Sequence, residues 1–123
     1  MVVKVVNIEE YEDEIYSIQH TNLRKNIFSK PSMNSEILIL TQENPILPHS
    51  HVNCETMIYI LQGEGKILYK DKLDRNFLLK EGTFLYISKG EIHQIVCTGQ
   101  KPLISLVFRN TNDEYAMMYN KNV

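Results

Sequence analysis

The most informative stretch of this sequence is residues 48–65, which read PHSHVNCETMIYILQGEG. Two histidines, His49 and His51, flank a single serine, and a carboxylate, an apolar run and a glycine turn follow them. Side chains two residues apart in a β-strand point to the same face, so both imidazoles are expected to project together. Two converging imidazole nitrogens can supply two ligands to one divalent metal ion.

A second stretch, residues 82–93, reads GTFLYISKGEIH and ends in a third histidine, His93. Its apolar run predicts a strand, and the tight turn at Gly90 predicts a backbone conformation with positive φ. His93 follows that turn on the next expected strand. Glu55, four residues after His51, is a candidate carboxylate for the same site.

Short strands separated by turns extend outward from both stretches. The segments are rich in β-branched and aromatic residues, show no helical period, and are separated by glycine, proline and asparagine turn signals. This pattern predicts an all-β antiparallel sandwich or barrel. The expected strands cover residues 37–40, 57–61, 66–69, 77–79, 84–87, 92–97 and 103–108, with a further short strand at Val2–Val6.

The two stretches resemble the two motifs of the cupin superfamily, in the right order. In the first motif, HxH and a downstream glutamate lead into a strand that ends at a glycine turn. In the second, a glycine, five residues, a Pro-x-Gly turn and a histidine follow in fixed spacing, and here Ser88 replaces the turn proline. The resemblance covers residues 36–108 and implies a small antiparallel jelly-roll β-barrel, with residues 1–123 as one cupin-like domain.

The resemblance also implies a metal site. His49, His51 and His93 match the three family histidines one for one. For the family glutamate, counting forward from His51 gives Glu55, whereas counting back from the turn glycine gives Thr56, so a four-ligand site with Glu55 and a three-histidine site both stay open. Such ligands suit a divalent Mn, Fe, Co, Ni, Cu or Zn ion and do not distinguish among these metals.

Other candidate residues have simpler interpretations. Cys54 and Cys97 are expected to be small buried side chains, although Cys97 stands where many cupins have asparagine. His20 and Arg109 are expected at the surface, with a metal or an anionic substrate as the less favoured role.

Composition limits the possible partners and compartments. The chain has 13 basic and 15 acidic residues, and the basic ones are scattered, which argues against a nucleic-acid partner. No apolar run has the length of a signal peptide or a membrane span, and two cysteines do not make a disulfide scaffold, so a cytoplasmic protein is expected. Exposed sheet edges and the resemblance both predict a homodimer.

Two functions are consistent with these features. The first is a metal-dependent enzyme of the dioxygenase or isomerase type that acts on a small polar organic molecule inside the barrel. The second is a non-catalytic cupin module that binds or senses a sugar or another small ligand. The sequence names no catalytic residue, because function depends on the pocket rather than on the fold.

Overall fold

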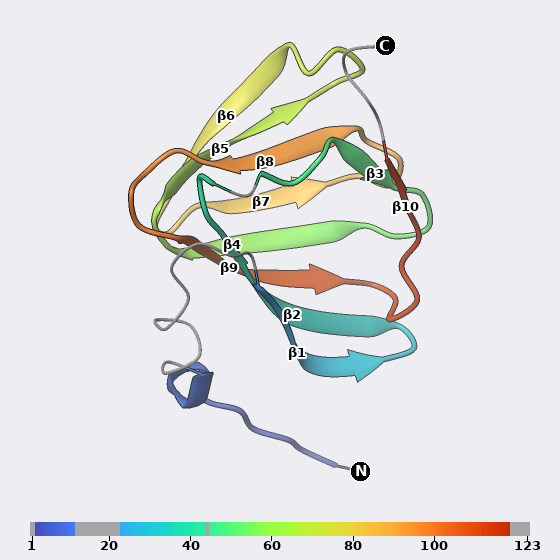
Figure 1. Cartoon of the computed structure of the whole chain (residues 1–123). Helices are drawn as coiled ribbons and strands as arrows, with labels where there is room; N and C mark the ends of the chain where they lie inside the picture. Colours follow the sequence, from blue (N-terminus) through green and yellow to red (C-terminus); the bar gives the residue numbers. More distant parts are fainter. Residues whose placement is uncertain (1, 12–22, 44, 119–123) are drawn as a thin grey trace.

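The computed structural model describes residues 2–11, 23–43 and 45–118, which form ten strands and one short 3-10 helix (Figure 1). The strands alternate inward and outward side chains, as the period-two pattern predicts. The elements are η1 Ile8–Tyr11, β1 Leu23–Lys30, β2 Met33–Leu40, β3 His49–His51, β4 Thr56–Gln62, β5 Glu64–Tyr69, β6 Arg75–Lys80, β7 Phe84–Ile87, β8 His93–Cys97, β9 Leu103–Arg109 and β10 Ala116–Met118.

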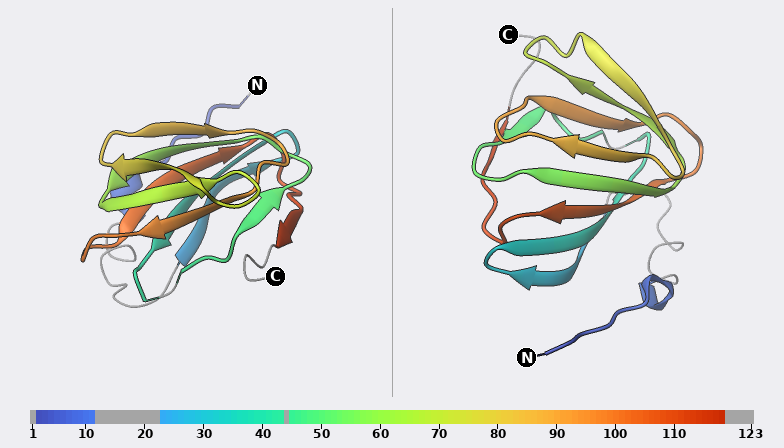
Figure 2. Two further views of the ribbon diagram at one scale, coloured as in Figure 1. Left: turned by 90° about the horizontal axis from the view of Figure 1, so that it is seen from above. Right: turned by 180° about the vertical axis from the view of Figure 1, so that it is seen from behind.

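The strands make two five-stranded sheets, with the orders β1-β2-β9-β4-β7 and β10-β3-β8-β5-β6. Each pairing for which a register is given is antiparallel. The two sheets pack face to face, as the three views in Figures 1 and 2 show. This arrangement confirms the expected all-β jelly-roll barrel.

The core lies between the sheets and is built from inward-facing side chains of both. Ile58 and Ile60 of β4, Ile67 of β5 and Val107 of β9 are all at most 5% exposed and belong to one cluster. Burying each aliphatic side chain of this size stabilises the fold by about 1.5–3 kcal/mol. The packed core therefore supports the strands that carry the polar groups at one end of the barrel.

The ends of the barrel correct the sequence-based expectations. Val2–Val6 is not a strand, because no described strand pairs with it, and it projects away from the sheets (Figure 1). The strands β1 and β10 were not expected, and β10 pairs with β3 through Ala116 and His51. His20 lies outside the described residues. None of the helices in the part of the chain that the structure describes is long and apolar enough to cross a membrane.

Candidate metal centre

Two neighbouring strands bring three histidines together. β3 carries His49 and His51 on one face, and β8 carries His93, whose Cα pairs in register with that of His49. The three ring centroids lie 4.5 to 5.4 Å apart. One nitrogen from each ring can be chosen so that all three lie within 4.8 Å of one another. The expected convergence of the histidines is therefore present.

Nδ1 forms a hydrogen bond in two of the histidines and lies close to a carboxylate in the third. His49 Nδ1 donates to Leu47 O at 2.9 Å, and His93 Nδ1 donates to Glu91 O at 2.9 Å. His51 Nδ1 lies 3.1 Å from a carboxylate oxygen of Glu114. Since carbonyl and carboxylate oxygens only accept, these contacts favour the proton on Nδ1 and leave the Nε2 lone pair of each ring for a metal ion.

Burial keeps two of the histidines neutral. It lowers the pKa of His49, and it lowers the pKa of His93 to about 3; the charges of neighbouring histidines and of Arg109 act in the same direction. Imidazole binds a metal only in its neutral form. At neutral pH, protons therefore do not compete with a metal ion for these two rings.

Behind His51 lies a network of charged side chains that begins at Glu114. Its carboxylate accepts from Arg24 Nη1 at 2.9 Å and lies 2.8 Å from Arg109 Nε. Both arginines also contact Glu36, Arg109 at 2.7 Å and Arg24 at 3.2 Å. Burial alone would raise the pKa of Glu114, but the contacts with His51, Arg109 and Arg24 outweigh it and lower that pKa to about 2. Glu114 is therefore an anion held between cations.

Hydrogen bonds hold the segment that carries Glu114 against the first histidine stretch, residues 48–65. Tyr115 accepts a hydrogen bond from Val52 N at 2.9 Å through its carbonyl oxygen and donates its own N–H to Asn53 Oδ1 at 2.7 Å. Asn53 Nδ2 in turn donates to Asp113 O at 2.6 Å. These bonds, together with the pairing of β10 and β3, hold the Glu114 carboxylate against His51.

The structure does not bring Glu55 to the histidines. Glu55 is exposed and precedes β4, and its carboxylate accepts a hydrogen bond from the hydroxyl of Tyr86 on β7. The next residue, Thr56, is 2% exposed and lines the histidine cavity together with Ile58. To reach the cavity, Glu55 would have to leave Tyr86 and turn to the other face of the sheet.

Two further sequence-based expectations can be compared with the structure. Cys54 and Cys97 are buried, as expected, and burial raises the pKa of the Cys54 thiol, which favours its protonated form in the metal-free protein. Cys54 nevertheless lies in a second group of possible ligands with His51 and Glu114. The expectation that Arg109 lies at the surface is wrong: it is 5% exposed, because it occupies an inward-facing position of β9.

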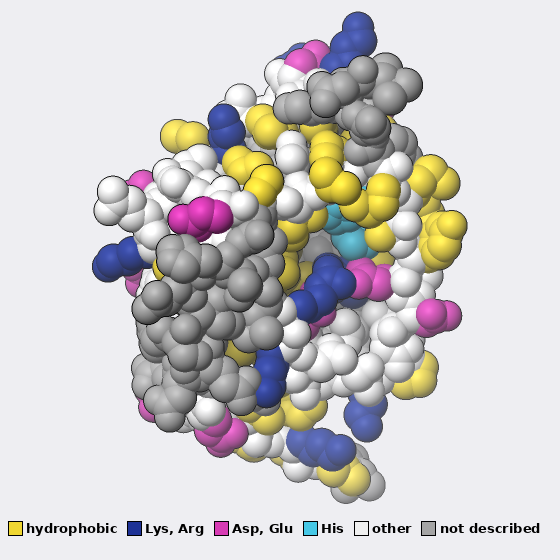
Figure 3. All heavy atoms as spheres, viewed as in Figure 1, with side chains coloured by type: hydrophobic (Ala, Val, Ile, Leu, Met, Phe, Trp, Pro, Cys, Tyr) yellow, Lys and Arg dark blue, Asp and Glu magenta, His cyan; other side chains and the backbone are white. Residues whose placement is uncertain are grey.

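The histidines line a small cavity of about 190 Å³ that also has Arg24, Arg109 and Glu114 in its wall. Figure 3 shows histidine side chains recessed in a hollow, with basic and acidic side chains beside them. Thr56 Oγ1 is buried there and has no hydrogen-bond partner among the described residues. The cavity thus combines three histidines that could hold a metal ion with charged groups that can orient a small polar molecule.

Sequence reasoning missed the role of two of these residues. The signal for Arg109 was the alternation Leu103, Ser105, Val107, Arg109, which places all four on the buried face of β9. Glu114 had no comparable signal, because it precedes a three-residue strand whose side chains are all exposed.

Comparisons with known proteins agree with this architecture. The sequence profile of the family described as "Cupin domain" matches residues 37–109. The structure is similar to an uncharacterized conserved protein with a double-stranded β-helix domain from Klebsiella pneumoniae (TM-score 0.78, 14% identity, covering 98% of this chain and 100% of that one). It is also similar to an RmlC-like cupin family protein from Methanocaldococcus jannaschii (TM-score 0.64, 16% identity, 76% and 83% coverage).

A larger protein shares the fold over part of its length. Oxalate decarboxylase from Lactobacillus farciminis, solved as a formate complex, has a TM-score of 0.69 and 22% identity over 81% of this chain. The match covers only 32% of the decarboxylase chain, and identities this low show the fold alone. No curated protein sequence matches the chain significantly.

Proposed function

The chain belongs to the cupin domain family, and from this premise we propose that His49, His51 and His93 hold a divalent transition metal ion. The observation that carries the proposal is the geometry of the three rings: Nδ1 of His49 and of His93 donates to a backbone carbonyl, and Nδ1 of His51 lies 3.1 Å from Glu114, which favours Nε2 of each ring as the metal-binding nitrogen. A carboxylate or carbonyl behind a ligating histidine fixes its tautomer and orientation, and such contacts are typical of metal sites. The donor set therefore fits Mn, Fe, Co, Ni, Cu or Zn.

We propose further that the protein is a metal-dependent enzyme of the dioxygenase or isomerase type. When bound, a divalent ion polarises an oxygen of a substrate and lowers the pKa of a bound water. The chain itself supplies Arg109, a buried guanidinium in the wall of the histidine cavity, which attracts and orients an anionic group. The aliphatic side chains of Leu38, Ile58 and Ile95 line the same cavity and limit access of water.

A small organic acid is the substrate class that this cavity suits best. Its carboxylate would be oriented by Arg109 while a second oxygen faces the histidines. The similarity in fold to an oxalate decarboxylase that was solved with formate points in the same direction.

One observation favours the alternative, a module that binds a small ligand without turnover. Glu114 is the carboxylate in the cavity wall, and its pKa of about 2 and its two arginine contacts make it a weak base at neutral pH. A catalytic base works best with a pKa near the operating pH. Among the described cavity residues, no other carboxylate lines the wall.

The two functions can be separated by experiment. The metal that co-purifies is identified by elemental analysis, and the metal-loaded protein is incubated with keto acids, phenols and uronic-type sugars. Turnover of one class supports the enzyme and identifies its substrate. No turnover, together with ligand-dependent thermal stabilisation, would leave the binding module.

We also propose that the protein is a homodimer. On the outer face of the first sheet, the neighbouring side chains of Tyr86, Met57 and Phe108 are 56%, 47% and 40% exposed, in register across β7, β4 and β9. A contiguous apolar row of this kind is typical of a surface that another protein covers. Light scattering should return twice the mass of one chain; the single-chain mass over a wide concentration range would contradict the dimer.

A further inference from the structure

A second cavity, larger than that of the histidines, opens between the two sheets. Its volume is about 460 Å³, and β5, β6 and β7 form its walls. Volumes of 300–1,000 Å³ are typical of pockets for small molecules. His93 lines this cavity as well as the histidine cavity, so a molecule bound here lies beside the candidate metal centre.

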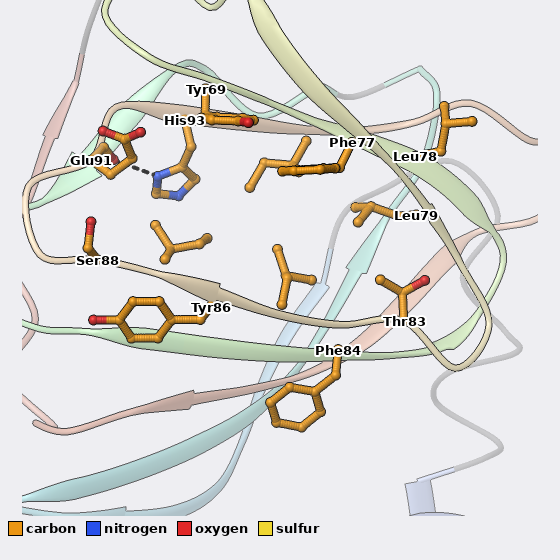
Figure 4. A pocket seen from close by; sticks show the side chains of 13 residues that line it. Tyr69, Phe77, Leu78, Leu79, Thr83, Phe84, Tyr86, Ser88, Glu91 and His93 are labelled. Atoms are coloured by element: carbon orange, nitrogen blue, oxygen red, sulfur yellow. Dashed lines mark hydrogen bonds between the residues drawn. The ribbon is translucent and has the colours of Figure 1, made fainter.

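The side chains that face into this cavity are apolar. They come from alternate positions of the three strands, and Figure 4 labels Tyr69, Phe77 and Leu79 among them. They are Ile67, Tyr69, Phe77, Leu79, Leu85 and Ile87. An apolar cavity of this kind gains free energy when an apolar group displaces its water.

Two parallel aromatic rings line one wall of the cavity. The rings of Tyr69 and Phe77 stack with an interplanar angle of 6° and a centroid distance of 5.5 Å. Phe77 occupies an inward-facing position at the rim and is 64% exposed, so much of its side chain is accessible to an occupant. Aromatic rings prefer offset-stacked or edge-on partners, and a flat pair of rings therefore favours a planar occupant.

Polar groups gather at one end of the cavity. Figure 4 shows Ser88, Glu91 and His93 together at that end, whereas Phe77 and Leu79 lie toward the other. An occupant is thus expected to lie with its polar group at His93 and its apolar body along the ring wall.

We propose that this cavity binds the ring of a small aromatic acid whose carboxylate lies at the His93 end, beside the metal ion. This inference rests on the proposed metal site and narrows the substrate class from organic acids to those that carry a planar apolar ring. The ring subsite itself consists of the six apolar side chains and does not need the metal.

The test compares two probes that differ only by a ring, phenylacetate and acetate. Their affinities are measured by calorimetry for the metal-free and the metal-loaded protein. In both forms we expect phenylacetate to bind at least tenfold more tightly than acetate, because binding transfers its apolar ring from water into the cavity. Metal loading should strengthen phenylacetate binding further. Equal affinities of the two probes in the metal-free protein would overturn the ring subsite.

A pair of matched variants locates the subsite. Phe77→Ser removes one of the two stacked rings, whereas Phe108→Ser removes an exposed phenylalanine of β9 that does not line the cavity. We expect at least a fivefold loss of phenylacetate affinity for Phe77→Ser and less than a twofold change for Phe108→Ser. Equal effects of the two variants would contradict this placement of the ring.

Two further measurements separate the subsite from the metal site. In the wild-type protein, nuclear Overhauser contacts should join the phenyl protons to the methyl groups of Leu79 and Ile87. If elemental analysis shows no metal while the ring preference persists, the ring subsite stands and the proposed metal site fails. If metal binds without strengthening phenylacetate binding, the placement of the carboxylate at the metal is wrong.

Discussion

The histidine cavity measures about 190 Å³ and has three charged side chains in its wall, whereas the cavity that shares His93 with it measures about 460 Å³ and is lined mainly by apolar side chains. In the small cavity the charged side chains near the histidines are held by one another, as in the contacts of Glu114 with Arg24 and Arg109. The large cavity has few such constraints. The comparison indicates that the first site selects by fixed geometry and charge, and the second by shape and burial.

Removing the shared residue should have the largest effect. His93→Ala leaves His49 and His51, and two imidazoles rarely retain a divalent ion in water, so we expect the purified variant to lose nearly all of its metal. Elemental analysis of wild type and variant, purified side by side, measures this. His20→Ala, a histidine that the sequence places outside the site, should keep the wild-type metal content.

The same variant also tests how separate the two cavities are. If the apolar cavity is independent of the metal, His93→Ala should retain the preference for phenylacetate over acetate. Equal metal content in wild type and His93→Ala would defeat the proposed metal site.

The next effect concerns the carboxylate that supports the metal centre. Glu114→Gln keeps the size of the side chain but removes the charge behind His51, and we expect metal affinity to fall about 10- to 100-fold, as for other groups that hold a ligating histidine. Glu55→Gln is the matched control, because Glu55 contacts Tyr86 outside the cavity. The metal affinity of this variant should stay within twofold of the wild-type value. Competition with a chromophoric chelator measures both.

A larger loss of metal affinity for Glu55→Gln than for Glu114→Gln would favour Glu55 as a direct ligand. The spectrum of the Co²⁺-loaded protein adds a second measurement. It should change for Glu114→Gln, because the orientation of His51 changes, and stay unchanged for Glu55→Gln.

A smaller effect is expected at the turn between β7 and β8, inside the second motif. Gly90 has φ of +82°, as its place in the turn predicted, and its N–H donates to His51 O at 2.9 Å. A β-branched residue is strained in this conformation, so Gly90→Val should destabilise the fold by about 1–3 kcal/mol and weaken metal binding. Thermal unfolding of the metal-free protein measures this loss of stability.

Gly99 provides the control for that substitution. It has no positive φ, and an added Cβ would meet its nearest neighbour, Glu64 Cβ, at an ordinary 3.5 Å. Gly99→Ala should therefore change the stability by less than about 0.5 kcal/mol. An unchanged melting temperature for Gly90→Val would mean that the turn tolerates side chains.

The central strands could be predicted from the sequence because their side chains alternate or form apolar runs. The strand β1, Leu23–Lys30, has a polar and basic sequence, because it lies at the edge of its sheet, where side chains meet water. The strand β10, Ala116–Met118, is short and exposed and exists through its pairing with β3. Edge strands of this kind depend on tertiary contacts rather than on a local pattern.

The site was predictable to the same extent. The three histidines lie in locally regular strands, so their spacing in the sequence determined the face of the sheet to which their side chains point. The choice between Glu55 and Thr56 depended on the phase of β4, and Ile58 and Ile60 could have settled it, because Thr56 shares their inward face. Glu114 was not predictable, since its contact with His51 depends on hydrogen bonds between chain segments far apart in the sequence.

The smallest effect is a dependence of stability on pH in the metal-free protein. Burial lowers the pKa of His93 from 6.5 to about 3, so the unfolded chain binds more protons than the folded one between these two values. Stability must then fall as pH decreases below 6.5, and the charge of His93 contributes no such slope above it. For this one group the loss between pH 7 and pH 5.5 is about 1 kcal/mol. Denaturant unfolding at both pH values measures it, and His93→Ala should show a shallower slope. A wild-type stability that rises on acidification over this range would contradict a buried, neutral His93.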